Sequence, residues 1–251
     1  MDKQTEKYKL QHFLQVENDE SYDFLDKLTV EELQKLRLQV IEVAQIEQAD
    51  IWKRLAGVAK FMPSFMNAKV AETVLGPLIS ANMSYYMPER DAIAIMKHMS
   101  VKFLAIVSEH MVPEKARHLI NAIPMDVMKK VTIQVISQKK YKTAAGFVDV
   151  LDIDRILDLS KVISNEEDLI HISLYVENKA YVAKIVEGFT LDRLLKIIET
   201  SYQMGMQDEV LRVFEYLSSP EVKRVLGLVN TMPDYMKNNV LNDFEGRIGK
   251  K

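Results

Sequence analysis

Apolar residues recur along this chain at the three- and four-residue spacing of amphipathic helices, and short breaks separate the periodic segments. No run alternates apolar and polar residues for long enough to predict a strand. The nearest one, Val131–Ser137, continues a helical spacing that begins at Met128 and is interpreted as helix. The pattern therefore predicts an all-α protein.

The N-terminal part of the chain predicts one long helix from about Val30 to Lys60, or to a break near Gly57. Thr29 and Glu32 have the spacing of a capping box, which satisfies two backbone N–H groups at a helix start. The predicted apolar stripe consists of Leu33, Leu36, Val40, Val43 or Ala44, Ile51, Leu55 and Val58, and Glu47 interrupts it. Such a helix packs along the rest of the chain or pairs two chains in a homodimer.

The remainder predicts shorter helices in pairs. The segments "MPERDAIAIMKHM" (Met87–Met99) and "VPEKARHLINAIP" (Val112–Pro124) both open with an apolar residue, Pro and Glu. A pair of short amphipathic helices cannot bury its apolar face alone, whereas stacked copies can. We therefore predict a superhelical stack of short helix pairs, an armadillo-like α-solenoid. A closed bundle is the alternative, but bundles usually need longer, matched helices.

Local signals mark the predicted joints and the domain organisation. Three prolines suit first helical positions, and two further Ser–Glu pairs have capping-box spacing: Pro88, Pro113 and Pro124; Ser164 with Glu167; Ser218 with Glu221. We expect residues 1–80 to form an N-terminal helical segment that packs on the repeats. Residues 81–251 are expected to form the helical-repeat domain, as one continuous structural unit with that segment.

The stretch "MPERDAIAIMKHMSVKFLAIVSEHMVPEKARHLINAIP" resembles the cytosolic N-terminal domain of MgtE-type magnesium transporters and the related middle region of a flagellar motor switch protein. Those domains repeat Pro-Glu-x-x-Ala segments with apolar helix pairs, and the likeness covers roughly Tyr86–Leu217. The resemblance implies a right-handed superhelix of short helices that responds to ions or partners. This sequence departs from the transporters because no transmembrane helices and no nucleotide-binding regulatory domain follow, so no ligand residues are carried over.

Composition removes several function classes. The 251 residues carry a net charge of −3, which argues against nucleic acid as a partner. Cysteine is absent, which excludes disulfides and thiolate chemistry. We find neither a signal peptide nor an apolar run long enough to span a membrane, and we expect a cytoplasmic protein. The lysines at 129–130 and 139–142 are interpreted as a solvated face.

Ion sites have weak support. His98, His110 and His118 are spaced by 12 and 8 residues, so no two of them form a helical metal-binding pair. Asp149, Asp152 and Asp154 form an acidic run that could hold Mg²⁺. Asp152 as a helix cap and Asp154 in the first helical turn is the favoured interpretation. Whether any of these six side chains binds an ion is left open, and no metal or cofactor is predicted.

Methionine is concentrated between positions 62 and 128. Flexible thioethers fill irregular core gaps, or they line surfaces that recognise varied apolar partners. The candidate apolar groove consists of Met62, Met66, Met83, Tyr86, Met87, Met96 and Met99. These residues would recognise a protein segment or an apolar small molecule.

The sequence contains no nucleophile elbow and no phosphate-binding loop, and it offers no catalytic residues. Enzymatic activity is left open but is not favoured. We predict a non-enzymatic binding or scaffold protein that contacts another protein through a groove on its stacked helices. The alternative is a helical protein, enzymatic or not, that binds a small molecule or lipid in a methionine-lined pocket.

Overall fold

The computed structural model describes residues 3–14, 16, 20–46 and 49–247, and every regular element within them is a helix. The N-terminal part comprises α1 (Lys3–Leu14), the 3₁₀ helix η1 (Glu20–Lys27) and α2 (Val30–Ile46). We call these three elements the N-terminal hairpin. The all-α prediction is confirmed.

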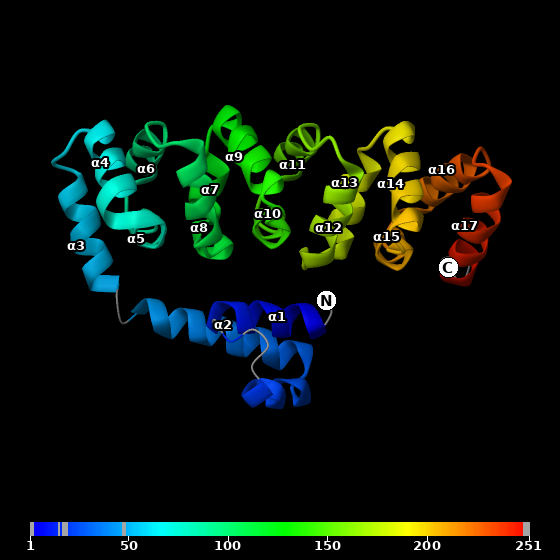
Figure 1. The fold of residues 1–251 in the computed structure, drawn as a ribbon, viewed down its shortest axis with the longest axis horizontal. Coiled ribbons are helices and arrows are strands. Elements are labelled where there is room, and N and C mark those ends of the chain that lie inside the picture. Colours follow the sequence, from blue (N-terminus) through cyan, green and yellow to red (C-terminus); the bar gives the residue numbers. More distant parts are fainter. Residues whose placement is uncertain (1–2, 15, 17–19, 47–48, 248–251) are drawn as a thin grey trace.

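The rest of the chain forms a row of short helices, α3–α17 (Figure 1). It begins with α3 (Ala49–Ala59), α4 (Ser64–Val70), the π-helical turn η2 (Ala71–Leu75), α5 (Gly76–Ser84), α6 (Glu89–Met96), α7 (Val101–Glu109), α8 (Pro113–Ala122) and α9 (Met125–Ser137). It continues with α10 (Tyr141–Val148), α11 (Ile153–Ser160), α12 (Glu166–Tyr175), α13 (Lys179–Glu187), α14 (Leu191–Gln203), α15 (Gln207–Phe214), α16 (Ser219–Val229) and α17 (Asp234–Arg247).

Helices in the row pack mainly against the helix two positions further along the chain. Thus α5 contacts α7, α7 contacts α9, α10 contacts α12 and α12 contacts α14. The main core lies between these helices and contains Ile120, Val150, Ile170, Leu194 and Phe214, each at most 2% exposed. Because each helix is short, it buries its apolar face only by contacting neighbours on both sides.

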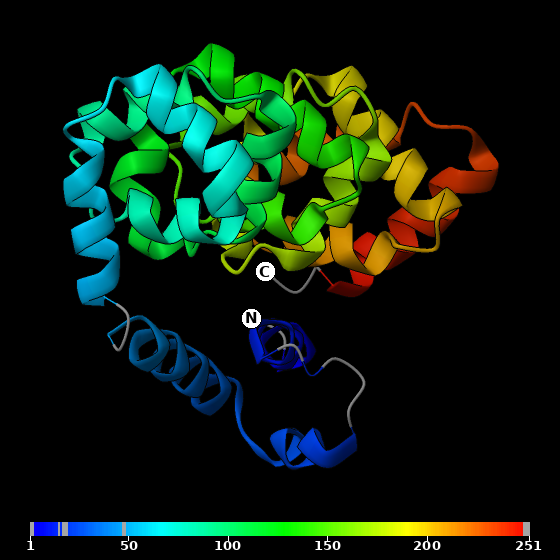
Figure 2. The ribbon, with the colours of Figure 1, turned by 60° about the vertical axis from the view of Figure 1, so that its left-hand side comes forward.

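The N-terminal hairpin lies beneath the row and runs along it (Figures 1 and 2). It has a small core of its own, in which Leu10, Leu25 and Leu33 are almost fully buried. The capping box that starts α2 is confirmed: Thr29 N–H donates to Glu32 Oε2 (2.7 Å), and Glu32 N–H donates to Thr29 Oγ1 (3.2 Å).

The segment expected to form one helix from about Val30 to Lys60 is divided between α2 and α3, which have different directions in Figure 1. The two helices pack against different partners, since α2 contacts α1 and α3 contacts α5. A single straight helix cannot satisfy both sets of contacts. Glu47, which we expected to interrupt the stripe, lies outside the described residues.

Helix starts agree with the sequence pattern to within one residue. Pro113 begins α8 as predicted, whereas Pro88 and Pro124 occupy the N-cap position, one residue before the helix. The capping box predicted for Ser164 is wrong, because the side chain of Asn165 accepts the Glu167 N–H instead (3.0 Å).

The capping box predicted at Ser218 is also not formed. Ser218 is at the N-cap of α16, but its side chain accepts no capping hydrogen bond. Glu221 instead bonds to Arg224 Nη1 at 2.9 Å. Asp152 is at the N-cap of α11 as predicted, again without a side-chain capping bond, and Asp154 is in its first turn.

A recurring arginine links a helix to the end of the helix three positions earlier in the chain. Arg155 in α11 donates to the carbonyl oxygen of Ile123, just after α8. Arg193 in α14 donates to the carbonyls of Ser160 (2.8 Å) and Ile163 (2.5 Å), at and after the end of α11. Arg224 in α16 donates to those of Glu187 (3.2 Å) and Phe189 (2.6 Å), at and after the end of α13. Each arginine satisfies carbonyls that a helix end leaves without an intrahelical donor.

Within the described part of the chain, none of the helices combines the length and the apolar character needed to cross a membrane.

Candidate functional site

Exposed apolar side chains gather at the first end of the row. Seven of the fourteen large hydrophobic side chains that are exposed in the described structure fall within residues 51–78. They are Ile51, Val58, Phe61, Phe65, Met66, Val74 and Leu78, which belong to α3, the α3–α4 turn, α4, η2 and α5. We call this group the apolar end. Clustered exposed apolar residues of this kind mark interaction sites in folded proteins.

A buried asparagine holds the turn that presents Phe61. Asn67 is 8% exposed, and its Nδ2 donates to the carbonyl oxygens of Ala59 (2.8 Å) and Met62 (3.1 Å). These bonds fix the end of α3 and the chain that follows it. As a result, Phe61 is held 89% exposed on an ordered turn rather than folding back into the core.

The π-helical turn η2 displays the second half of the apolar end. It ends at Gly76, whose φ of 77° lies in the left-handed region that favours glycine. The Gly76 N–H donates to the Ala71 carbonyl, the five-residue step of a π turn. Val74, before Gly76, is 74% exposed, and Leu78, after it, is 54% exposed. Single π turns occur frequently at functional sites.

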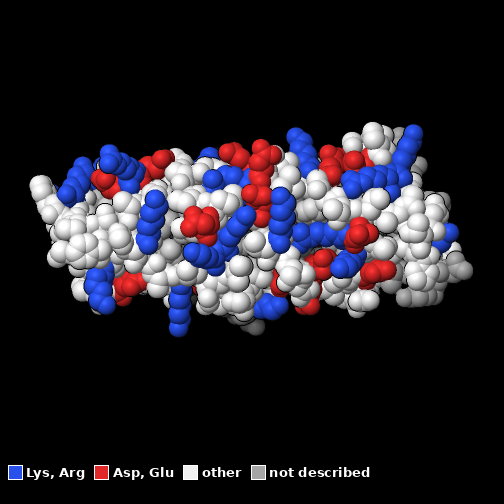
Figure 3. Space-filling view, turned by 90° about the horizontal axis from the view of Figure 1, so that it is seen from above, with Lys and Arg blue, Asp and Glu red and all other residues white. Residues whose placement is uncertain are grey.

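The charges around the apolar end are mainly basic. Lys53, Arg54, Lys60 and Lys69 are exposed there. The acidic residues of the same helices are Asp50, 3.9 Å from Lys53, and Glu72. The Glu72 carboxylate accepts the Ser100 N–H at 2.6 Å, and this bond lowers its pKa. Figure 3 shows a broad area without charged residues at the same end of the row.

The opposite end of the row has a different surface. Its last helix, α17, buries Val240 and Phe244, and the Phe244 ring lies 5.7 Å from that of Phe214. On the other side of α17, Asn238 and Asn242 are exposed. A stack of helices needs a polar outer face on each terminal unit if nothing covers it. The described part of α17 has such a face, whereas on α3–α5 the seven exposed apolar side chains of the apolar end stand beside the charged ones.

The residues of the predicted methionine groove do not share one environment. Met83 is buried, Met66 is exposed and belongs to the apolar end, and Met96 lines the interior cavity described next. The others are half-buried: Met62, Tyr86, Met87 and Met99. Lys53 Nζ lies 5.9 Å from the centre of the Tyr86 ring, which joins this tyrosine to the basic rim.

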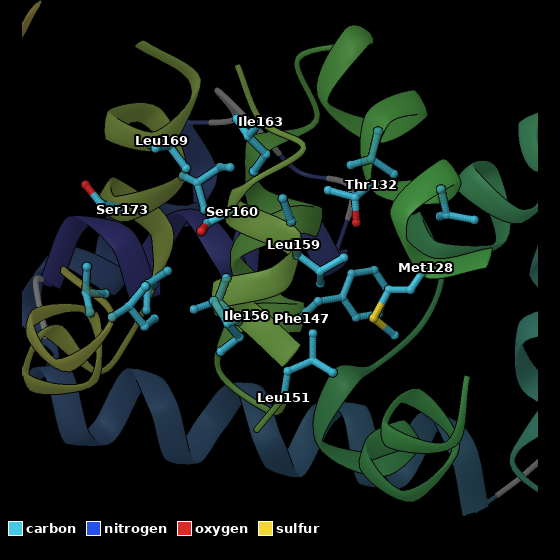
Figure 4. Close-up of a pocket in the computed structure, with 18 of the residues that line it drawn as sticks. Met128, Thr132, Phe147, Leu151, Ile156, Leu159, Ser160, Ile163, Leu169 and Ser173 are labelled. Atoms are coloured by element: carbon cyan, nitrogen blue, oxygen red, sulfur yellow. The ribbon is translucent and has the colours of Figure 1, made fainter. Parts of the chain in front are cut away.

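A cavity of about 170 Å³, partly open to solvent, lies between the helices of the row, and we call it the interior cavity (Figure 4). Its lining extends from Met96 in α6 to Phe214 in α15. Met128, Thr132, Phe147 and Leu159 are among the lining side chains drawn in the close-up. The lining side chains are hydrocarbon or thioether apart from four hydroxyls, those of Ser108, Thr132, Ser160 and Ser173.

A buried ionic cluster joins the N-terminal hairpin to the row. Arg37 in α2 contacts Glu6 in α1 (3.1 Å) and Glu177 after α12 (3.1 Å). Lys9 Nζ lies 2.6 Å from the same Glu177 carboxylate. Glu6 is fully buried and Arg37 is 6% exposed. These ion pairs hold the hairpin against the row. Removing any one partner would destabilise the protein, because the charge that remains would be buried and unpaired.

Asp149 belongs to the same region. Both of its carboxylate oxygens accept the Glu177 N–H, at 3.1 and 3.2 Å. Burial raises its pKa to about 6, and the nearby Lys9 opposes that rise. The run Asp149, Asp152 and Asp154 thus serves a helix start and a buried contact between segments. No group of three His, Asp or Glu side chains in the described residues has the geometry to hold a metal ion.

Three of the lysines at 129–130 and 139–142 pair with acidic side chains. Lys139 lies 2.9 Å from Asp168, and Lys140 lies 2.8 Å from Glu109. Lys129 lies 3.9 Å from Asp158. Lys142 departs from the solvated face expected from the sequence, because its Nζ is buried and lies 4.5 Å from the centre of the Tyr8 ring in α1.

Comparisons with protein-family models, with curated proteins and with solved structures find no match. The resemblance to MgtE-type domains therefore rests on the quoted sequence alone.

Proposed function

We propose that this protein is an α-solenoid that binds a partner protein through its apolar end, without catalysing a reaction. The single observation that carries the proposal is the apolar outer face of α3–α5 at an end of the row. Burying that face against another surface removes large side chains such as Phe61 and Val74 from water, which favours association.

Three features support the solenoid arrangement. Contacts run from each helix to the one two positions along, the arginine links recur, and the two ends of the row differ in polarity. The proposed resemblance to the N-terminal domain of MgtE-type transporters fits this arrangement. A stack of this kind provides a rigid platform, and its terminal unit is free to dock other molecules.

We assign the partner's chemistry from the rim. An apolar centre flanked by Lys53, Arg54, Lys60 and Lys69 is complementary to an amphipathic helix that carries acidic residues beside its apolar stripe. Such a helix would bury the two phenylalanines and place its carboxylates near the lysines. Complementary charge would raise the association rate and align the two surfaces.

Affinity capture from the cytosol of the source cells tests this proposal. The full chain is compared with the variant Phe61→Ser/Phe65→Ser and with the matched control Ile133→Ser/Tyr216→Ser. The control residues are 52% and 54% exposed and lie elsewhere on the row. All four side chains are at the surface, so thermal unfolding should agree between the three proteins.

We expect one partner to be retained by the unaltered chain and by the control, and lost from the apolar-end variant. Lys60→Glu/Lys69→Glu should weaken the same capture, and more strongly at low salt. Equal capture by all variants would contradict the proposal. So would binding only to vesicles containing anionic lipid, or a doubled mass in light scattering that the apolar-end variant abolishes. The latter result would identify a homodimer.

A further inference from the structure

The interior cavity is separate from the apolar end. Its lining begins at Met96, whereas the last exposed member of the apolar end is Leu78. Lining residues come from helices between α6 and α15, which follow one another along the row in Figure 1. The cavity is therefore extended along the row rather than confined between two helices.

Its lining offers hydrocarbon and few free polar groups. The hydroxyl of Ser108 donates to the Ala105 carbonyl (2.6 Å), and that of Ser160 donates to the Leu157 carbonyl (2.8 Å). Ser173 Oγ is similarly bonded to the Ile170 carbonyl (2.8 Å). No charged side chain is among the lining residues. A charged or strongly polar ligand would lose its hydration in this space without replacement.

The size of the cavity suits an organic ligand. A cavity of about 150 Å³ lined by Leu, Ile and Phe stays dry and takes up benzene. The cavity here has a volume of about 170 Å³ and a lining of the same kind, and because it is partly open to solvent a chain can enter it. An apolar ligand in this space would gain dispersion contacts with the side chains of the wall. Its transfer out of water would also favour binding.

We propose that the interior cavity binds an unbranched alkyl chain. The extended shape favours a linear chain over a compact ring system, and the lack of lining charges requires the polar head to remain outside. A free fatty acid and the acyl chain of a phospholipid share this chemistry. This proposal goes beyond the docking function and uses none of its residues.

The first test uses delipidated full-length protein and the fluorescent probe cis-parinaric acid, a linear polyene fatty acid. Saturated fatty acids of increasing length are then used to displace the probe. Each added methylene should tighten binding about four-fold until the cavity is filled, after which affinity should level off. Phospholipid vesicles without free fatty acid form the second arm. Displacement by fatty acids identifies the free acid as the source, and displacement only by vesicles identifies the lipid acyl chain.

Two neighbouring residues of α9 provide a matched pair of variants. Thr132 faces the cavity in Figure 4, whereas Ile133 is 52% exposed. Thr132→Phe should fill the cavity and weaken probe binding at least ten-fold, while Ile133→Phe should leave binding unchanged. If Thr132→Phe does not fold, Ala144→Leu supplies a smaller filling substitution at another lining position.

Absence of probe and fatty-acid binding to the unaltered chain in both arms would overturn the proposal. Equal weakening by Thr132→Phe and Ile133→Phe would also overturn it, as would affinity that rises with chain length without levelling off. Thr132 lies outside α3–α5, so these outcomes leave partner capture by the apolar end unchanged. The two proposals can therefore fail separately.

Discussion

At the residue scale, the N-terminal hairpin is held by a few buried charges. Arg37 contacts three carboxylates, those of Glu6 and Glu177 at 3.1 Å each and that of Glu114 at 3.8 Å. One oxygen of Glu6, Oε1, has no hydrogen-bond partner, and Lys9 Nζ is 3.7 Å from it. Such a cluster specifies where the hairpin docks more than it adds net stability, because its desolvation offsets much of the attraction.

Arg37→Met should therefore release the hairpin from the row. The substitution leaves the Glu6 carboxylate buried without its main partner, at a cost of about 3 kcal/mol. Amide hydrogen exchange should show about a hundred-fold loss of protection in α1, with α10–α15 little changed. Asp50→Asn, which affects an exposed pair, is the control and should leave exchange unaltered. Unchanged protection of α1 in Arg37→Met would contradict this role.

Asp149 should make stability depend on pH. Its folded pKa of about 6 is above the ordinary value of 3.8, because burial disfavours the charged carboxylate. Between these values the folded state binds more protons than the unfolded state, so the free energy of unfolding falls as pH rises from about 4 to 6. The stability that Asp149 contributes is fully present below its pKa in the unfolded chain. It is lost as the pH rises through its pKa in the folded protein.

Asp149→Asn should reduce that fall by an amount on the order of 2 kcal/mol. Urea unfolding at pH 4.5 and pH 7 measures it. Asp158→Asn is a suitable comparison, since Lys161 lowers the pKa of that exposed carboxyl. Asp158 therefore contributes stability that is lost as the pH falls, the opposite of Asp149. A pH dependence in Asp149→Asn identical to that of the unaltered chain would rule out Asp149 as its source.

At the element scale, much of the helical pattern could be predicted. Apolar spacing identified the short helices, including α9 over Val131–Ser137. Helix starts were less certain, because a serine three residues before a glutamate does not determine which residue becomes the cap, as Ser164 and Asn165 illustrate. The linking arginines were missed, although "DRIL", "DRLL" and "KRVL" place an arginine before two apolar residues in three helices.

The arginine links should contribute measurably to stability. Arg193→Met removes the donors for the carbonyls of Ser160 and Ile163, both in buried residues, and should cost about 2–3 kcal/mol in urea unfolding. Arg193→Lys should not restore the loss, because an ammonium group lacks the planar fork that reaches two acceptors. Arg212→Met, at a side chain 47% exposed, should cost less than about 1 kcal/mol. Equal losses for Arg193→Met and Arg212→Met would contradict the role of the link.

At the scale of the whole molecule, the arrangement depends on contacts that local patterns do not encode. The sequence predicts that short helices must stack, but not that the N-terminal hairpin folds beneath α10–α12. That docking requires Arg37 and Glu177, 140 residues apart, to meet. The cavity depends on how side chains from several helices fill space, which apolar spacing leaves undetermined.

Only part of the apolar end could be predicted from the sequence. Met62 and Met66 were selected for their residue type, whereas Phe61, Phe65, Val74 and Leu78 were not. A usable signal was present in "FMPSFM", which places Phe61 in a proline-containing turn, where small polar residues are usual, and Phe65 in the first turn of α4. Their exposure becomes evident only when the neighbouring helices are in place.

The central claim, that α3–α5 form the docking surface, is tested most directly by photo-crosslinking in the source cells. A photoreactive phenylalanine analogue is placed at Phe61 or, as the control, at Tyr216, both exposed in the free chain. We predict a covalent adduct with one acid-rich partner protein from position 61 and none from position 216. The same adduct from both positions, or irradiation that yields only uncrosslinked chain, would contradict the claim.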